Sequence, residues 1–98
     1  MFYVIQLSKL DNIAVSSGNI PENASIESHN IKTITKIPQG HKVSIKGIKK
    51  GEKIIKYGQI IGAATKNIQA GEHVHSHNLA FVEFKRETLG QSIKKIDL

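Results

Sequence analysis

Three histidines follow one another at a spacing of two, in the last third of the chain. They are His73, His75 and His77, and Asn78 comes directly after them. Side chains two positions apart in an extended segment project from the same face, so the three imidazoles would point one way. Neutral imidazoles so arranged can ligate a metal ion, and His and Asn side chains can bind the carboxylate and hydroxyl groups of a small acid. The alternative is a solvated strand face on which the histidines have no chemical role.

A second polar pair, His41 and Lys42, follows a glycine earlier in the chain. Lys42 could pair with a substrate carboxylate, and His41 could donate or accept a proton. Alternatively, the two are simply exposed polar residues that follow a turn. Both interpretations stay open. Tyr57 is a weaker candidate, because a tyrosine is more often a half-buried packing residue with a hydrated hydroxyl group. The chain contains no nucleophile elbow, phosphate-binding loop or paired-carboxylate signature.

The elements that would position these residues are marked by a repeated turn. The pattern Ile-x-x-Gly-x-x-Ile/Val occurs around Gly40, Gly51 and Gly71, and a looser copy has Asn23 in place of the glycine. Asn tolerates a left-handed backbone better than most residues, so we predict a tight turn with positive φ at each of the four positions. The spacing between copies is uneven, which argues against a solenoid.

Composition favours a small all-β domain. The 98 residues include 16 Ile and 5 Val but only 5 Leu, and β-branched side chains suit a pleated sheet better than a helix. We predict one domain over residues 1–85, with almost no helix, and a tail over 86–98 that could be a terminal helix or an extension. The predicted strands cover residues 2–7, 13–16, 31–37, 42–45, 52–55, 60–65 and 80–84.

Several classes of protein are disfavoured by the same composition. The absence of cysteine excludes a disulfide framework and a thiolate zinc site. The formal charge is +6, but the lysines are scattered and the aromatic residues few, so a nucleic-acid interface is not expected. No apolar run is long enough to cross a bilayer and the first residues do not read as a signal peptide, so we expect a cytoplasmic protein without membrane contact.

Residues 5–81 carry a combination of short motifs that is specific as a set. It resembles the SAF domain at the amino end of altronate and galactarate dehydratases, and the small subunit of sulfolactate sulfo-lyase. The matching residues are Asp11 through Val15, Ile37-Pro38, Gly40-His41-Lys42, Lys56-Tyr57-Gly58, Ile61-Gly62, Ala64-Thr65, Gly71-Glu72, Val74-His75 and His77-Asn78.

The resemblance implies a β-clip fold with short strands and Gly-rich tight turns. It also implies a lyase that dehydrates a small acidic sugar, with this chain as an accessory subunit beside a large catalytic one. Fe²⁺ is the divalent metal that the resemblance implies, held by His75 and His77. We expect the partner to complete the site, since the carboxylates usual in iron sites are absent nearby except for Glu72. A homo-oligomer stays open.

The resemblance also implies roles for individual residues. His41, His75 and His77 are the expected catalytic residues, and Lys42, Tyr57 and Asn78 are the expected substrate-binding residues. His73 gains nothing from the resemblance and is left without a role, as is His29. The rival hypothesis is a non-catalytic SAF-type module that binds carbohydrate or protein, which would have no need of the His75 and His77 pair.

Overall fold

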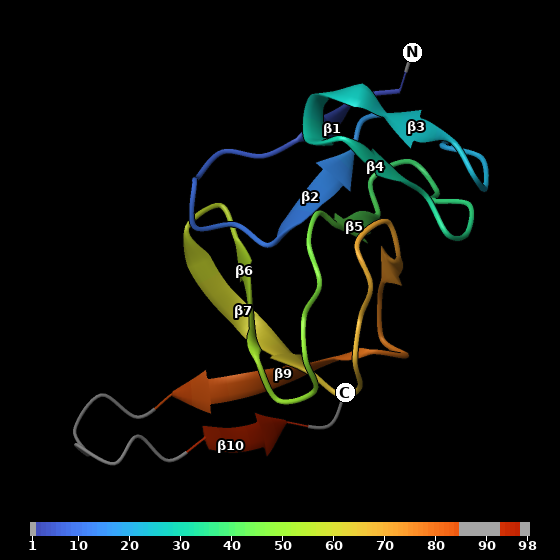
Figure 1. The fold of residues 1–98 in the computed structure, drawn as a ribbon. Coiled ribbons are helices and arrows are strands. Elements are labelled where there is room, and N and C mark those ends of the chain that lie inside the picture. Colours follow the sequence, from blue (N-terminus) through green and yellow to red (C-terminus); the bar gives the residue numbers. More distant parts are fainter. Residues whose placement is uncertain (1, 85–92, 97–98) are drawn as a thin grey trace.

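A computed structural model of the protein describes residues 2–84 and 93–96 (Figure 1). All pairings between its strands are antiparallel, and the only helical element in the described part is a single 3₁₀ turn, η1 (Glu27–His29), so the predicted all-β fold class is confirmed. No helix among the described residues has the length and apolar character to span a bilayer. The strands are β1 (Val4–Ile5), β2 (Ile13–Ser16), β3 (Ser25–Ile26), β4 (Ile31–Lys32), β5 (Lys42–Ser44), β6 (Lys53–Lys56), β7 (Gln59–Ala64), β8 (His73–Val74), β9 (Leu79–Phe84) and β10 (Ile93–Ile96).

The strands form three small sheets. One has the order β1-β2-β5-β8, a second has the order β10-β9-β7-β6, and β3 pairs with β4 alone. In Figure 1 the β3–β4 pair lies at one end of the molecule and β9 with β10 at the other, with β2 and β5 between them. The strands have two to six residues each, so a large part of the chain lies in the turns between them.

The four predicted turns have the predicted backbone conformation. The φ angles are 58° at Asn23, 80° at Gly40, 87° at Gly51 and 88° at Gly71. Gly71 is further constrained because an added Cβ would lie 1.9 Å from the carbonyl oxygen of Lys32, whereas no atom would lie within 4 Å of one added at Gly51. Of the three turn glycines Gly40, Gly51 and Gly71, Gly71 alone combines a left-handed backbone with a clash against another segment.

The four turns assemble in two pairs. Ile20 and Ile37 exchange two backbone hydrogen bonds, at 2.9 and 2.7 Å, which join the first turn to the second. Ile48 and Ile68 join the third turn to the fourth in the same way, at 2.8 and 2.7 Å. The uneven spacing in the sequence thus conceals a repeated arrangement in space.

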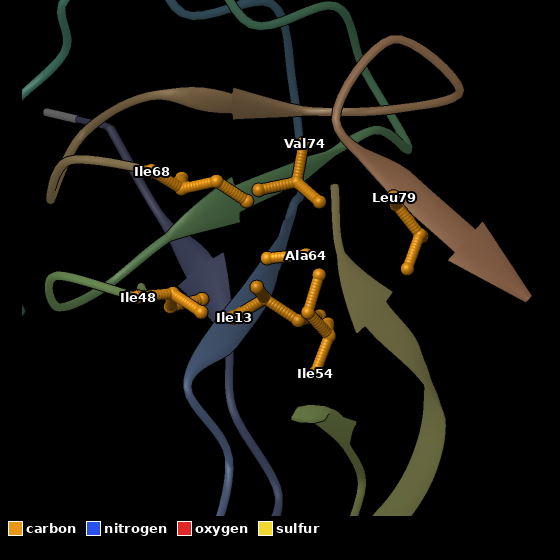
Figure 2. Close-up of a cluster of buried hydrophobic side chains, with 7 residues drawn as sticks. All are labelled: Ile13, Ile48, Ile54, Ala64, Ile68, Val74 and Leu79. Atoms are coloured by element: carbon orange, nitrogen blue, oxygen red, sulfur yellow. The ribbon is translucent and has the colours of Figure 1, made fainter. Parts of the chain in front are cut away.

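Each pair of turns builds its own buried core. The apolar residues that flank the first two turns lie in what we call the first core, and those that flank the last two lie in the second core. Burying each of these Ile or Val side chains stabilises the fold by about 1.5–3 kcal/mol. The first core contains Ala14, Ile20, Ile26, Ile37 and Val43, and the second, shown in Figure 2, contains Ile13, Ile48, Ile54, Ala64, Ile68, Val74 and Leu79.

The sheet of β2, β5 and β8 separates the two cores. On β2, Ile13 enters the second core and the next residue, Ala14, enters the first, as expected when successive side chains point to opposite faces. The paired strands β5 and β8 follow the same rule, with Val43 in the first core and Val74 in the second. These strands therefore contact both halves of the protein.

The predicted strands are correct in place, and their bounds differ from the observed ones by more than one residue in two cases. Of residues 2–7 only Val4–Ile5 are strand, and of 31–37 only Ile31–Lys32. The chain leaves β4 because Thr33 bonds the first turn, donating from its hydroxyl group to the carbonyl oxygen of Pro21 at 2.6 Å. Strands β3 and β8 were not predicted. In the tail, residues 93–96 form β10 against β9, and the remainder of 86–98 lies outside the described residues.

Candidate functional site

The register of β5 against β8 brings the histidines together. Lys42 pairs with Val74 and Val43 pairs with His73. Continuing this antiparallel ladder by one residue places His41 opposite His75 and diagonal to His73. His41, His73 and His75 therefore lie on one face of the strand pair, just beyond the point where Val43 enters the first core.

The three imidazoles are in direct contact. The Nδ1 atom of His41 lies 2.8 Å from the Nε2 atom of His73, which is a hydrogen bond between the rings. The ring of His41 stacks on those of His73 and His75, with centroids 5.0 and 4.9 Å away. One nitrogen from each ring lies within 4.8 Å of the others. We call these three residues the histidine triple.

His77 belongs to the same cluster but not to the triple. Its ring is tilted against that of His73, with 5.6 Å between the centroids. The expectation that an extended segment aligns His73, His75 and His77 is only partly correct, because β8 ends at Val74 and residues 75–78 form a turn. The structure nevertheless places all three rings together with His41.

The cluster lies at a partly exposed edge of the molecule. His41 and His73 are half-buried, while His75 and His77 are exposed. Burial lowers the pKa of His73 below its ordinary value of 6.5, and the charges of His41, His77, His75 and Lys42 lower it further. At neutral pH His73 is therefore held in the uncharged form, which can accept a proton or donate a nitrogen lone pair.

Asn78 holds the turn that carries His75 and His77. It is completely buried, and its Oδ1 atom accepts a hydrogen bond from the backbone N–H of His75 at 2.9 Å. Its Nδ2 atom donates to the carbonyl oxygen of His73 at 2.9 Å and to Glu72 Oε2 at 3.3 Å. The structure thus shows Asn78 orienting the histidines from beneath, and its predicted contact with substrate remains a prediction.

Lys42 and Tyr57 lie outside the triple. Alternation along β5 directs Lys42 to the face opposite His41, and burial followed by the charge of Lys56 lowers the pKa of Lys42. Tyr57 occupies the turn between β6 and β7 with φ at 53°, is 38% exposed, and has the Nζ atom of Lys56 5.0 Å from its ring centroid. Lys42 is close enough to influence the charge of His73.

The turn chemistry explains why a histidine can occupy position 41. The residue after the turn glycine is Glu52 in the third turn and Glu72 in the fourth, where its carboxylate accepts a backbone hydrogen bond from Lys49 at 2.6 Å and from Gln69 at 3.0 Å. The second turn has Pro38 at the position equivalent to Lys49 and Gln69. Since proline has no N–H group, no carboxylate is needed there. The side chain of His41 is therefore free to contact His73.

The donor atoms of the triple suit a divalent metal ion. Three neutral imidazole nitrogens are ligands for Zn²⁺, Fe²⁺, Ni²⁺ or Cu²⁺. The nearest carboxylate in the sequence, Glu72, already uses both oxygens, one for Gln69 and one for Asn78. The residues thus fit a metal, and the group contains His75 of the predicted pair, while His77 as a ligand stays a prediction.

His73 is the residue that the sequence analysis set aside. Its spacing from His75 was visible, but its contact with His41 depends on the β5–β8 register across 32 residues. A signal was present, since the second and fourth turns share the same pattern and could have been aligned. Such an alignment would have suggested that the strands following Gly40 and Gly71 are equivalent.

The chain is similar in sequence to a known protein family and to individual proteins. Residues 2–81 match the profile of a protein family described as the altronate/galactarate dehydratase SAF domain. The chain is similar to altronate dehydratase of Escherichia coli (strain K12), 40% identical over 77 residues, and to altronate dehydratase of Bacillus subtilis (strain 168), 34% identical over 76 residues. Each match covers 76% of this chain but only 15% of the dehydratase.

A shorter type of relative is also found. The chain is 48% identical over 42 residues to (2R)-sulfolactate sulfo-lyase subunit alpha of Paracoccus pantotrophus, covering 43% of this chain and 63% of that subunit. A domain of this kind therefore occurs both as a small part of a long protein and as most of a separately named subunit.

Proposed function

The chain belongs to the altronate/galactarate dehydratase SAF-domain family, and from this membership we propose that it is the small subunit of a lyase that dehydrates a sugar acid. In this proposal it supplies histidine side chains to an active site completed by a large catalytic partner. The observation that carries the proposal is the clustering of four imidazoles on one partly exposed edge. They come from the residue before β5, from β8 and from the turn that follows β8.

Dehydration of a sugar acid requires two proton movements. A base removes the proton next to the carboxylate, and an acid protonates the hydroxyl group that leaves from the neighbouring carbon. Imidazoles can serve in either role near neutral pH. His75 and His77, which are exposed, could reach the substrate, while the 2.8 Å contact between His41 and His73 would let a proton pass to a second ring.

Binding of an acidic substrate is supported by positive charge. Lys42 lies near enough to the cluster to affect the pKa of His73, so its ammonium group would draw a carboxylate toward this edge. Tyr57 is proposed as a more distant contact through its exposed hydroxyl group. A divalent metal, Fe²⁺ being the one that the resemblance implies, would be held by the histidine triple and would stabilise negative charge on the substrate carboxylate.

The large partner is inferred from the size of the relatives. The chain spans 15% of the altronate dehydratases that it matches, so the greater part of those proteins has no counterpart here. The sulfo-lyase relative is named as a subunit, which supports an arrangement on separate chains. The rival hypothesis, a non-catalytic binding module, is less well supported because such a module does not require four clustered imidazoles.

The test is reconstitution with a large dehydratase subunit from the same source. Dehydration of altronate and galactarate, and elimination from sulfolactate, would be measured with each chain alone and with both. We expect turnover only from the mixture, and a loss of about 10²–10⁴-fold for His75→Ala or His77→Ala without loss of folding. His29→Ala is the matched control, because that ring bonds Gln6 and Ser28 instead. Full turnover by the His75→Ala/His77→Ala double variant would support the binding module.

A further inference from the structure

We propose that His41, His73 and His75 form a metal site within this chain alone, selective for a late first-row divalent ion such as Co²⁺, Ni²⁺ or Zn²⁺. The resemblance implies instead a metal held by His75 and His77 and completed by ligands from a partner. The difference is that the structure provides a third imidazole, His73, and joins it to His41.

The geometry needs little adjustment to accept an ion. With metal–nitrogen bonds of about 2.0–2.1 Å, two nitrogens on a tetrahedral metal lie about 3.3 Å apart. His41 Nδ1 and His73 Nε2 are 2.8 Å apart, so inserting an ion replaces their hydrogen bond with a separation only slightly larger. The nitrogens of the triple lie within 4.8 Å of one another, and His75 is exposed, so its ring can rotate toward the other two.

The backbone beneath the triple is held in place. Asn78 bonds the carbonyl oxygen of His73 and the N–H of His75, which fixes both residues relative to each other. The segment before them is bonded to β5, since Gly71 donates to Ser44 at 2.7 Å and Ser44 donates to Glu72 at 2.9 Å. A ligand set supported in this way loses little conformational entropy when the ion binds.

The donor set indicates which ions are preferred and what they could do. The group that the structure describes contains imidazole nitrogen only, which favours late first-row metals over Mg²⁺ or Ca²⁺, since those prefer oxygen ligands. Three protein ligands leave at least one coordination position open, as in catalytic sites and unlike closed structural sites. The charge of the bound ion is not neutralised by these ligands, so the open position would accept water or the carboxylate of a small acid.

This inference concerns the residues of the proposed function but does not depend on it. Metal binding is measured on the isolated chain, whereas dehydration is measured on the reconstituted enzyme. A chain that binds metal but supports no turnover would refute the lyase proposal alone. A reconstituted enzyme that turns over while the isolated chain binds no metal would refute the metal site alone.

The experiment uses the full chain without a polyhistidine tag, stripped of metal with a chelator and dialysed. Co²⁺ is titrated in, its visible absorption is recorded, and stoichiometry and affinity are checked by calorimetry. We expect one ion per chain, and affinity at least about tenfold weaker in His41→Ala and in His75→Ala. His29→Ala is the matched control and should bind as the wild type does, because its ring bonds Gln6 and Ser28 instead.

Far-ultraviolet circular dichroism and thermal melting of each variant separate loss of a ligand from loss of the fold. His41 and His75 are chosen for the main variants because neither is fully buried. Absence of a Co²⁺ band in the folded wild type would overturn the site. Affinity equal to that of the wild type in the folded His41→Ala and His75→Ala variants would overturn it as well.

Discussion

The Nδ1 atom of His41 and the Nε2 atom of His73 lie 2.8 Å apart, although 32 residues separate them in the sequence. Their contact exists because β5 and β8 are neighbours in the sheet and pair with Val43 opposite His73. The relative position of these two rings is therefore determined by the register of β5 against β8.

The His41–His73 contact predicts a measurable coupling energy. The free energy of unfolding of His41→Ala, His73→Ala and the double variant forms a double-mutant cycle under metal-free conditions. Because a hydrogen bond between neutral, half-buried groups contributes about 0.5–1.5 kcal/mol, we expect a coupling of that size. The same cycle between His41→Ala and Asn67→Ala should be additive. A coupling near zero between the two histidines would show that their rings do not interact in solution.

Asn78→Ala should destabilise the protein by about 2–3 kcal/mol. The substitution removes the side-chain partner of the His75 N–H and of the His73 carbonyl oxygen, both in part-buried hydrogen bonds. Asn67→Ala is the control, since its Oδ1 accepts one exposed hydrogen bond from Lys50 and its loss should cost under about 1.5 kcal/mol. Urea denaturation of both variants measures the difference. Equal stability of the two would contradict a structural role for Asn78.

Gly71 and Gly51 should respond differently to the same substitution. Alanine at Gly51 meets no atom within 4 Å, so it carries only the cost of a left-handed backbone, about 1–2 kcal/mol. Alanine at Gly71 carries that cost and also collides with the carbonyl oxygen of Lys32. We expect Gly71→Ala to be at least about twice as destabilising in thermal or urea unfolding.

Valine at these turn positions is a related test. A β-branched side chain is strained at positive φ, so Gly40→Val or Gly51→Val should lower the free energy of unfolding by roughly 1–3 kcal/mol. A neutral effect at both positions would mean that the turns change conformation readily in solution.

Stability should fall in acid because of Asp11. Burial alone would raise the pKa of its carboxyl group, but hydrogen bonds from the backbone N–H groups of Gly58, Ser8, Tyr57 and Leu7 outweigh burial, and the pKa lies below 3.8. The unfolded chain then binds a proton more readily than the folded one. This stabilisation is complete above pH 3.8 and is lost as the pH falls through the pKa of the folded state.

Asp11→Asn isolates this contribution. The amide can accept on one side only, so at neutral pH the variant should be less stable than the wild type by about 1–3 kcal/mol. Urea unfolding of both proteins as a function of pH should show the difference shrinking below pH 3.8, where the wild-type carboxylate becomes protonated. A difference that stays constant down to the acid limit would contradict the role assigned to the charge.

The turns were predictable from the sequence because their cause is local. Positive φ at Gly40 or Asn23 follows from residue type and from the apolar residues three positions to either side. The strand of residues 13–16 was predicted with its exact bounds, since Ile13 and Val15 are β-branched residues in a short run. The role expected for His75 rests on the period-two spacing of the histidines and, beyond that, on the resemblance.

The parts that were missed depend on contacts between distant segments. Strand β8 has two residues, too few for a pattern, and exists because Val43 and Val74 must each be buried on opposite sides of one sheet. The strand predicted over 31–37 ends early because Thr33 bonds Pro21 of the first turn and Ile34 donates a hydrogen bond to Gly71 at 2.9 Å. His73 was overlooked for the same reason, since only the register places it beside His41.

Strand β5 places Val43 in the first core and β8 places Val74 in the second. The histidine cluster therefore forms only when both cores are assembled. A partly folded chain with only one pair of turns assembled would leave either Val43 or Val74 in water, and the two strands would have no reason to stay in register. Such an intermediate could not gather the imidazoles. Incompletely folded or damaged molecules would then lack the assembled histidine cluster and its chemistry. Hydrogen exchange at the amides of β5 should occur only through opening of the whole domain.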